Sequence, residues 1–214
     1  MKLDIFDFDG TLAFTPENTP ENVEKYEKYH GIPWLVNKEQ SVYLSQKLGT
    51  HVPIRRGWWG REETLMPPLV PNPAPKELFN QEIVDRFFDS KKDENITTLI
   101  LTGRHFKLKN QILRILSDGG LIEVKKTKIN TDTFYHPQDP DVTLYCLGEK
   151  GPFSSTNIPS ETFPWKSWII DQYLNNYDFE SVEIWEDRTE HVEKFQELKN
   201  SYPQTFNINH VVSS

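Results

Sequence analysis

The chain has 214 residues, a length that suits one sizeable α/β domain with an elaboration better than two independent domains. Hydrophobic residues make up 36% and charged residues 26%, which supports a packed core and argues against wholesale disorder. The net charge of −8 excludes a general polyanion binder, so any contact with nucleic acid has to be local, through a basic patch on an acidic body.

The composition also bears on the compartment. The single Cys146 excludes an internal disulfide and fits a reducing compartment. No apolar run approaches the ~20 residues needed to span a bilayer. The N-terminus has no signal-peptide pattern. We therefore expect a cytoplasmic protein with no membrane contact.

The N-terminal third begins with a strand and then changes character. Residues 3–8 form a short apolar run typical of a strand, and the turn signal Asp9-Gly10 ends it. Residues 13–75 differ because they are rich in Pro, Gly and polar residues and contain one patch of Trp and Arg. Within them, residues 66–75 hold five prolines, which predict an extended connector rather than a helix.

The middle of the chain predicts a helix, a strand and a second helix in succession. Residues 76–89 carry apolar residues spaced for one helix face. Residues 97–102 are β-branched and apolar throughout, as in a strand buried on both faces. Gly103 follows, and apolar residues then repeat every four positions until Gly119-Gly120 ends the second helix. The apolar positions are Phe79, Ile83 and Phe87 in the first helix and Leu108, Ile112 and Leu116 in the second.

The C-terminal part continues this alternation. It predicts strands at 121–129 and 142–147, a helix opened by Pro164, a strand at 182–185, a helix at 188–200 and a last strand at 206–212. Such alternation indicates an α/β fold with a mostly parallel sheet and helices on both sides. Sites in these sheets form at the carboxyl ends of the strands. No boundary is visible inside the chain, so we expect a single domain, 1–214.

Two carboxylates, Asp7 and Asp9, stand two residues apart at the end of the first strand, in Asp-Phe-Asp-Gly-Thr-Leu. Carboxylates so close together repel each other and need a cation or a shared proton. A hard divalent ion such as Mg²⁺ meets that need with oxygen ligands. The alternative is that the pair forms a turn or a cap, as short acidic pairs at strand ends often do.

Further polar residues fall at the same edge of the predicted sheet. Thr102, Gly103 and Arg104 end a buried strand and open a helix, where a hydroxyl and free N–H groups suit a phosphate or an ordinary helix cap. Lys166 lies in the first turn after Pro164, where a cation opposes the helix dipole unless a bound phosphate reverses that effect. A solvated lysine is the alternative.

An acidic pair completes this set. Glu186-Asp187 follows the strand Val-Glu-Ile-Trp and brings more negative charge to the edge, although it also suits an N-cap for the next helix. The chain thus contains, in this order, Asp-Phe-Asp-Gly-Thr-Leu, Leu-Thr-Gly-Arg, a lysine and an acidic pair after a strand. With these motifs it resembles the haloacid dehalogenase (HAD) superfamily. The four motifs span most of the chain, and the first is the most specific.

The resemblance implies a Rossmann-like three-layer sandwich, Mg²⁺ as cofactor and a phosphatase mechanism. Asp7 would attack phosphorus, and Asp9 would protonate the leaving group and then activate water. Thr102 and Lys166, with Gly103 and Arg104 beside them, would hold the phosphoryl oxygens. The implied metal ligands are Asp7, the backbone carbonyl of Asp9 and Asp187, with Glu186 as an outer partner.

A closer resemblance concerns the substrate. Trp165-Lys166-Ser167-Trp168 and the segment 184–192 are similar to the 3'-phosphatase module of polynucleotide kinase-phosphatase and to the HAD domain of Swiss Army knife RNA-repair proteins. This likeness implies a nucleic-acid end or a nucleotide as substrate. The acidic pair departs from the Asp-Asp of the polynucleotide kinase-phosphatase module, which leaves the role of Glu186 open. The segment between Leu12 and Thr97 is also longer than in that module.

The superfamily places a cap over its active site at the position of residues 13–75, so we expect a cap-like insertion there. Its patch of rings and cations is suited to stacking a base and following a phosphate backbone. The alternative is that the tryptophans pack the insertion onto the core and the arginine stems cover them. The patch consists of Arg55, Arg56, Trp58, Trp59 and Arg61.

Three other features are interpreted as structural. Lys125, Lys126 and Lys128 form a basic cluster typical of a solvated strand edge. His191 falls early in a helix and is interpreted as structural or surface. Cys146 sits in a predicted strand as a small core residue.

The leading hypothesis is a Mg²⁺-dependent phosphatase that acts on polynucleotide ends, 3'-phosphatase-like, in RNA or DNA repair. An alternative keeps the chemistry and changes the substrate to a mononucleotide or a small phosphometabolite. Another alternative is a non-catalytic module with this fold that binds nucleic acid. A kinase or ligase partner for the other repair steps is left open by the sequence.

Overall fold

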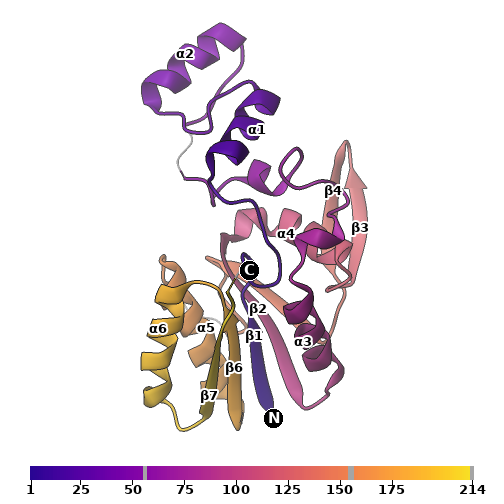
Figure 1. Cartoon of the computed structure of the whole chain (residues 1–214), viewed down its shortest axis with the longest axis vertical. Helices are drawn as coiled ribbons and strands as arrows, with labels where there is room; N and C mark the ends of the chain where they lie inside the picture. The colour runs from indigo at the N-terminus through magenta and orange to yellow at the C-terminus, as the bar shows by residue number, and fades with distance from the viewer. Residues whose placement is uncertain (55–56, 154–156, 213–214) are drawn as a thin grey trace. The chain divides into compact units, whose positions relative to one another are not determined.

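A five-stranded parallel sheet forms the centre of the larger part of the molecule (Figure 1). The computed structural model describes residues 1–54, 57–153 and 157–212. The strand order is β5-β2-β1-β6-β7, and every neighbouring pair is parallel. The strands are β1 (Lys2–Phe6), β2 (Ile96–His105), β5 (Val142–Leu147), β6 (Ser181–Glu186) and β7 (Thr205–His210). The predicted parallel α/β fold is thereby confirmed.

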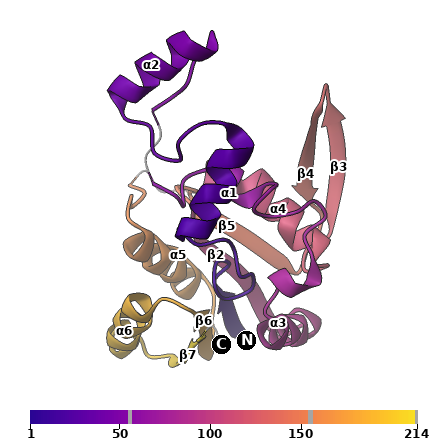
Figure 2. The same cartoon turned by 45° about the horizontal axis from the view of Figure 1, so that its top comes forward.

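Helices cover both faces of this sheet (Figure 2). Leu3 and Ile5 of β1 point to one face, where they join a buried cluster with Trp165 and Phe195. Phe6 points to the other face, where its ring lies 5.3 Å from that of Phe87. The helices are α3 (Gln81–Lys92) and α4 (Lys109–Asp118) on the side of Phe87, and α5 (Thr162–Asn176) and α6 (Thr189–Leu198) on the side of Trp165. This is the three-layer arrangement expected of the fold.

The chain forms two compact units. The first contains Met1–Phe14 and Pro75–Ser214 and holds the sheet. The second, Thr15–Ala74, is inserted between the end of β1 and α3. Its helices are α1 (Pro20–His30) and α2 (Lys38–Leu48), and a short 3-10 helix, η1 (Glu62–Leu65), follows them. A cap function for the inserted unit stays a prediction.

The helix predicted at 76–89 begins later than expected. Lys76–Leu78 forms only a single 3-10 turn, η2, and α3 starts at Gln81. The backbone groups at the junction of η2 and α3 form hydrogen bonds to another segment instead of within a helix. Phe14 N–H donates to Leu78 O, and Asn80 N–H donates to Leu12 O. These bonds tie together the outgoing and returning chain at the insertion, and a helix through residues 78–80 would not leave those groups available.

Three regular elements were not predicted at all. Helices α1 and α2 have clear end signals, with N-caps Thr19 and Asn37 and glycine C-caps in the left-handed conformation. They bury only one residue each, Tyr26 and Ser41, so neither shows an apolar stripe. The third missed element is strand β4 (Asp132–Pro137), which pairs with β3 (Val124–Ile129) in a separate antiparallel hairpin. The strand predicted at 121–129 therefore begins three residues later than expected, at Val124, and belongs to this hairpin.

Two short 3-10 helices complete the description, η3 (Phe106–Leu108) after β2 and η4 (Lys199–Ser201) after α6. Cys146 is buried in β5, as expected of a small core residue. Across the described residues, no helix combines the length and the apolar character that crossing a membrane requires.

Substitution of Trp165 tests the core. Its side chain is fully buried and its indole N–H donates to Glu149 O at 3.1 Å. Trp165→Ala should lower the free energy of unfolding by about 3–5 kcal/mol, because a large cavity remains and the carbonyl loses its partner. Urea denaturation measures this. The control is Ile129→Ala at an exposed position of β3, which should change stability by less than about 0.5 kcal/mol. Equal effects of the two variants would contradict the core assignment.

Candidate active site

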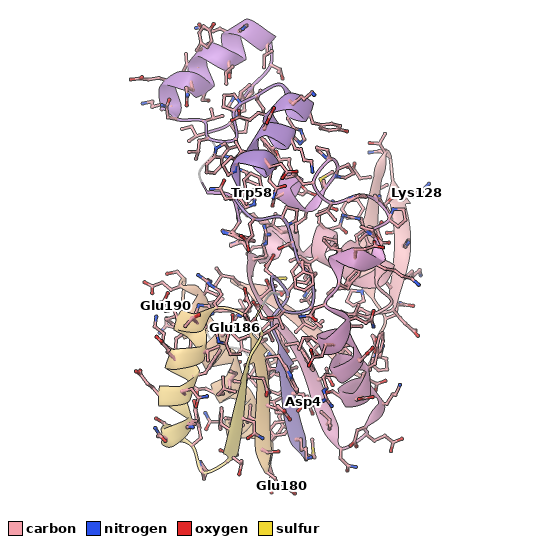
Figure 3. All side chains as sticks on the ribbon, viewed as in Figure 1. Asp4, Trp58, Lys128, Glu180, Glu186 and Glu190 are labelled. Atoms are coloured by element: carbon pink, nitrogen blue, oxygen red, sulfur yellow. The ribbon has the colours of Figure 1, made fainter. Side chains whose placement is uncertain are left out.

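The candidate site lies where β1, β2 and β6 end. Asp7 directly follows β1, Thr102–Arg104 lie near the end of β2, and Glu186 is the last residue of β6. Figure 3 shows Glu186 at the upper end of its strand. Because these strands are parallel neighbours, their carboxyl ends meet at one edge of the sheet. Lys166 reaches the same edge from the first turns of α5.

A buried ammonium group joins two carboxylates at this edge. Lys166 Nζ lies 2.8 Å from Asp7 Oδ1 and 2.7 Å from Glu186 Oε2. All three side chains are at most 6% exposed. Lys166 is therefore not the solvated lysine that the sequence left open. A buried charge of this kind is stable only when it is paired and hydrogen-bonded, and Lys166 is both.

Glu186 is held from two further directions. His191 Nδ1, on α6, lies 3.3 Å from Glu186 Oε2. The backbone N–H of Arg188 donates to Glu186 Oε1 at 3.3 Å. His191 is buried, which agrees with its interpretation as structural and excludes the surface alternative, but its contact with Glu186 was not predicted. The signal was its place in the first turn of the helix after the acidic pair, where a side chain can turn back to the strand end.

The pKa values follow from burial and these contacts. Burial and the charge of Glu186 hold the pKa of Asp7 well above its usual range. Burial alone would lower the pKa of Lys166, but the charges of Asp7 and Glu186 outweigh it and raise the pKa. Burial would raise the pKa of Glu186, but Lys166 lowers it to about 2. Burial, with the Glu186 charge, raises the pKa of Asp187 to about 6.

Asp9 has a separate partner. Arg104 Nη2 donates to Asp9 Oδ1 at 2.9 Å, and Arg104 Nε donates to the same carboxylate at 3.0 and 3.1 Å. Thr102 Oγ1 donates to Asp9 Oδ2 at 3.4 Å and accepts from the Arg104 backbone N–H at 3.1 Å. Two groups predicted to hold a phosphate, Thr102 and Arg104, thus contact Asp9 in this structure. Their phosphate-binding role stays a prediction.

Two glycines of the motifs allow close packing around the site. Gly10 has a φ of +73°, and a Cβ placed there would lie 2.2 Å from Asp187 Oδ2. At Gly103, a Cβ would lie 2.7 Å from Thr162 Cγ2 at the start of α5. Gly10 thus brings the first motif against Asp187, and Gly103 brings the end of β2 against the helix that carries Lys166.

Three carboxylates form a group suited to a divalent cation. Asp7, Glu186 and Asp187 each offer an oxygen atom, and these atoms lie within 4.8 Å of one another. Asp187 Oδ1 is buried and has no hydrogen-bond partner among the described residues. Oxygen donors with an excess of negative charge over the single Lys166 ammonium fit a hard cation. Glu186, expected as an outer partner, belongs to this group, whereas the Asp9 carboxylate does not.

The Trp and Arg patch of the inserted unit is mostly buried within that unit. Trp58 is 2% exposed and its indole N–H donates to Pro16 O at 2.7 Å. The buried Arg61 guanidinium lies 5.6 Å from the ring centres of Tyr26 and Trp34. These positions favour the packing alternative for Trp58 and Arg61, although here the packing is inside the unit. Trp59 is 45% exposed, and its contact with the substrate stays a prediction. The predicted contacts Arg55 and Arg56 lie outside the described residues.

Comparison with known proteins identifies one family. The model for "HAD domain family 1 in Swiss Army Knife RNA repair proteins" matches residues 40–213. The matched range includes Thr102, Lys166 and Asp187 and begins after Asp7 and Asp9. The assignments of Asp7 and Asp9 therefore depend on their motif and on the geometry above. No curated protein and no solved structure matches the chain.

Substitution of Gly10 tests the contact between the first motif and Asp187. Gly10→Ala should destabilise the protein through both its positive φ and the overlap with Asp187. Gly120→Ala is the matched control, because Gly120 has a φ of +74° and nothing within 4 Å of a new Cβ. The control should cost about 1–2 kcal/mol of backbone strain in urea denaturation. Gly10→Ala should cost at least about 2 kcal/mol more. Equal losses would mean that the contact with Asp187 does not constrain the site.

Proposed function

The chain belongs to HAD domain family 1 of Swiss Army Knife RNA repair proteins, and on this basis we propose that it is a Mg²⁺-dependent phosphohydrolase that removes a terminal phosphate from a polynucleotide. The reaction would be 3'-phosphatase-like and proceed through an aspartyl-phosphate on Asp7. The observation that carries the proposal is the buried Lys166 bound to Asp7 at the carboxyl edge of the sheet. It places a cation beside the carboxylate that would attack a phosphate.

The first step forms the covalent intermediate. Lys166 holds Asp7 Oδ1, so that Oδ2 supplies the electron pair that attacks phosphorus. The new bond joins Asp7 Oδ2 to phosphorus, and the bond from phosphorus to the leaving oxygen breaks. Asp9 gives its proton to that oxygen, which leaves as the hydroxyl of the polynucleotide end.

The second step regenerates the protein. Asp9, now a carboxylate, takes a proton from a water molecule, and the water oxygen attacks phosphorus. The bond between phosphorus and Asp7 Oδ2 breaks and inorganic phosphate leaves. Arg104 and Thr102 hold the Asp9 carboxylate in place, so that one group serves as acid and then as base.

The cation would be held by Asp7 and Asp187, with the backbone carbonyl of Asp9 as the further predicted ligand. When bound, Mg²⁺ neutralises negative charge on the transferring phosphoryl group. Glu186 has the different task of holding Lys166, since its Oε2 accepts a hydrogen bond from that ammonium. Lys166 then stabilises the additional charge that the phosphoryl oxygens acquire.

The alternative substrate is a mononucleotide or small phosphometabolite, which the net charge of −8 favours. A non-catalytic binding module is disfavoured, because a binder needs neither the acid/base carboxylate of Asp9 nor the buried nucleophile. We further propose a cytoplasmic location and retain the inserted unit Thr15–Ala74 as a cap.

Replacement of the nucleophile tests the proposed chemistry. Asp7→Asn should reduce phosphate release at least about a thousandfold, because an amide oxygen cannot form the covalent intermediate. The assay measures phosphate released with Mg²⁺ from oligonucleotides with 3'- or 5'-phosphate, mononucleotides and sugar phosphates. Asp178→Asn makes the same charge change at an exposed position and should leave turnover unchanged. Turnover retained in Asp7→Asn would refute the mechanism, whereas a preference for sugar phosphates would refute only the polynucleotide substrate.

Metal-dependent stabilisation tests the ligand assignment. Mg²⁺ at a hundredfold excess over its dissociation constant should stabilise the wild type by about 2.7 kcal/mol. Asp187→Asn should lose most of this increment, because it removes a proposed ligand. Asp9→Asn should retain it while losing turnover, since the metal would use the backbone carbonyl at that position. Unfolding with and without Mg²⁺ measures each increment as a difference within one variant. Loss of the increment in Asp9→Asn would show that its carboxylate is a ligand.

A further inference from the structure

The hairpin of β3 and β4 concentrates positive charge on an acidic protein. Lys125, Lys126 and Lys128 fall within four residues of β3, and all three are exposed. None of them forms an ion pair with the residues that the structure describes. Figure 3 shows Lys128 on the hairpin, well separated from Glu186 and Glu190. With three lysines against one acidic residue, Asp132, this hairpin is locally positive in a chain of net charge −8 and is suited to binding an anion.

Rings stand beside these cations. Lys126 pairs across the hairpin with Tyr135, and its Nζ lies 5.4 Å from the ring centre. Lys125 pairs with His136. Phe134, which pairs with Thr127 two positions further along, is 38% exposed. Directly opposite residues share a face of the hairpin, so each face presents a lysine close to a ring. Lysines that bind phosphates, interleaved with rings that stack on bases, are the combination that single-stranded nucleic acid requires.

The hairpin is fixed to helix α4, which follows the β2 end of the candidate active site along the chain. Asn110, the second residue of α4, donates from Nδ2 to Thr133 O at 3.0 Å and accepts at Oδ1 from Tyr135 N–H at 2.9 Å. Helix α4 starts only five residues after Arg104, at the edge of the sheet where β2 ends. Figure 2 shows the hairpin beside α4. Both belong to the unit that contains Asp7 and Lys166.

An exposed ring also lies between the site and the hairpin along the chain. Phe106 is 45% exposed, and its ring centre lies 4.3 Å from that of His105, the last residue of β2, with the two ring planes tilted by 35°. A hairpin of six-residue strands is about 20 Å long. It is therefore long enough to contact several nucleotides of a strand whose end lies in the site.

The usual explanation for such lysines is protection of an exposed strand edge. That explanation accounts for charge along β3, the outer strand. It does not account for exposed Phe134 on β4, whose outer backbone edge is already bonded by Asn110. Edge protection would also be served by acidic residues, which are more numerous in this chain than basic ones.

We propose that the β3–β4 hairpin is the docking surface for the single-stranded nucleic acid that carries the terminal phosphate. The inference rests on the proposed function, which it deepens by naming how the strand is held. Lys125, Lys126 and Lys128 bind its phosphates, and Phe134 stacks on a base. The hairpin thereby selects single strands over duplexes, in which bases are not available for stacking.

Binding of a fluorescently labelled 12-nucleotide RNA without a terminal phosphate, followed by anisotropy, tests the surface. The triple variant Lys125→Gln, Lys126→Gln, Lys128→Gln should bind at least about tenfold more weakly at low salt. For this variant, the slope of log affinity against log salt concentration should be less steep by about 2. Each of the three lost phosphate contacts on a single strand accounts for roughly 0.7 of this change. Phe134→Ala should weaken binding about tenfold without changing that slope.

The matched control is Lys2→Gln, Lys92→Gln, Lys199→Gln. These lysines are exposed at the amino-terminal edge of the sheet, and their removal changes the net charge by the same amount. This control should bind RNA nearly as the wild type does, and thermal unfolding should show every variant folded. Equal weakening in both triple variants would overturn the proposal, as would binding of duplex at least as tight as binding of single strand.

This binding assay needs no turnover, so it separates the hairpin from the proposed reaction. Wild-type protein that binds RNA through the hairpin and hydrolyses no phosphate ester would refute the proposed function and leave the docking surface standing. Wild-type protein that hydrolyses the 3'-phosphorylated RNA, with affinity unaffected by the hairpin variant, would refute the docking surface alone.

Discussion

The Lys166 ammonium, buried between Asp7 and Glu186, is the interaction on which the candidate site depends. Its two carboxylates stand at the ends of β1 and β6, and Lys166 itself is on α5, so one charge connects β1 to two elements that are far from it in the chain. Removing a single partner of a buried ion pair typically costs about 3–5 kcal/mol, because the other charge stays buried without compensation. Here the loss of Lys166 would leave two carboxylates facing each other. The positive charge beside the proposed nucleophile, Asp7, is thus also required for the packing of the sheet edge.

This constraint gives a physical reason for glutamate rather than aspartate at position 186. The longer side chain lets Oε2 reach Lys166 and lie near His191, while Oε1 accepts the backbone N–H of Arg188. Glu186 is thereby committed to holding Lys166. Asp187 has a buried oxygen without a hydrogen-bond partner among the described residues and remains the better candidate for a cation. The departure from an Asp-Asp pair is consistent with a division of labour between orienting a lysine and binding a metal.

The central sheet was predictable because parallel strands buried on both faces appear as apolar runs, as in 97–102 and 182–185. The site edge was predictable because its residues directly follow those runs. Helices α1 and α2 were not, since each buries a single residue and stability within their unit comes from contacts such as Arg61 with Tyr26 and Trp34. The pairing of Arg104 with Asp9 was also out of reach. Spacing brings residues to one edge, but it does not decide which cation meets which carboxylate.

The distribution of charge over the whole chain bears on how the proposed strand would be oriented at the site. A chain of net charge −8 repels a polyanion over most of its surface, and a carboxylate-rich site repels its terminal phosphate as well. Inside the site, Lys166 and the proposed divalent cation would offset that repulsion. Outside it, the exposed lysines of β3 would offset it over about 20 Å, the length of the hairpin. Because repulsion elsewhere is unfavourable, the proposed strand would be held only where both sets of cations act together, with its body on the hairpin and its end beside Asp7. An acidic body would then improve the orientation of the proposed strand instead of preventing its binding, since it removes the competing places where a basic protein would bind nucleic acid unproductively.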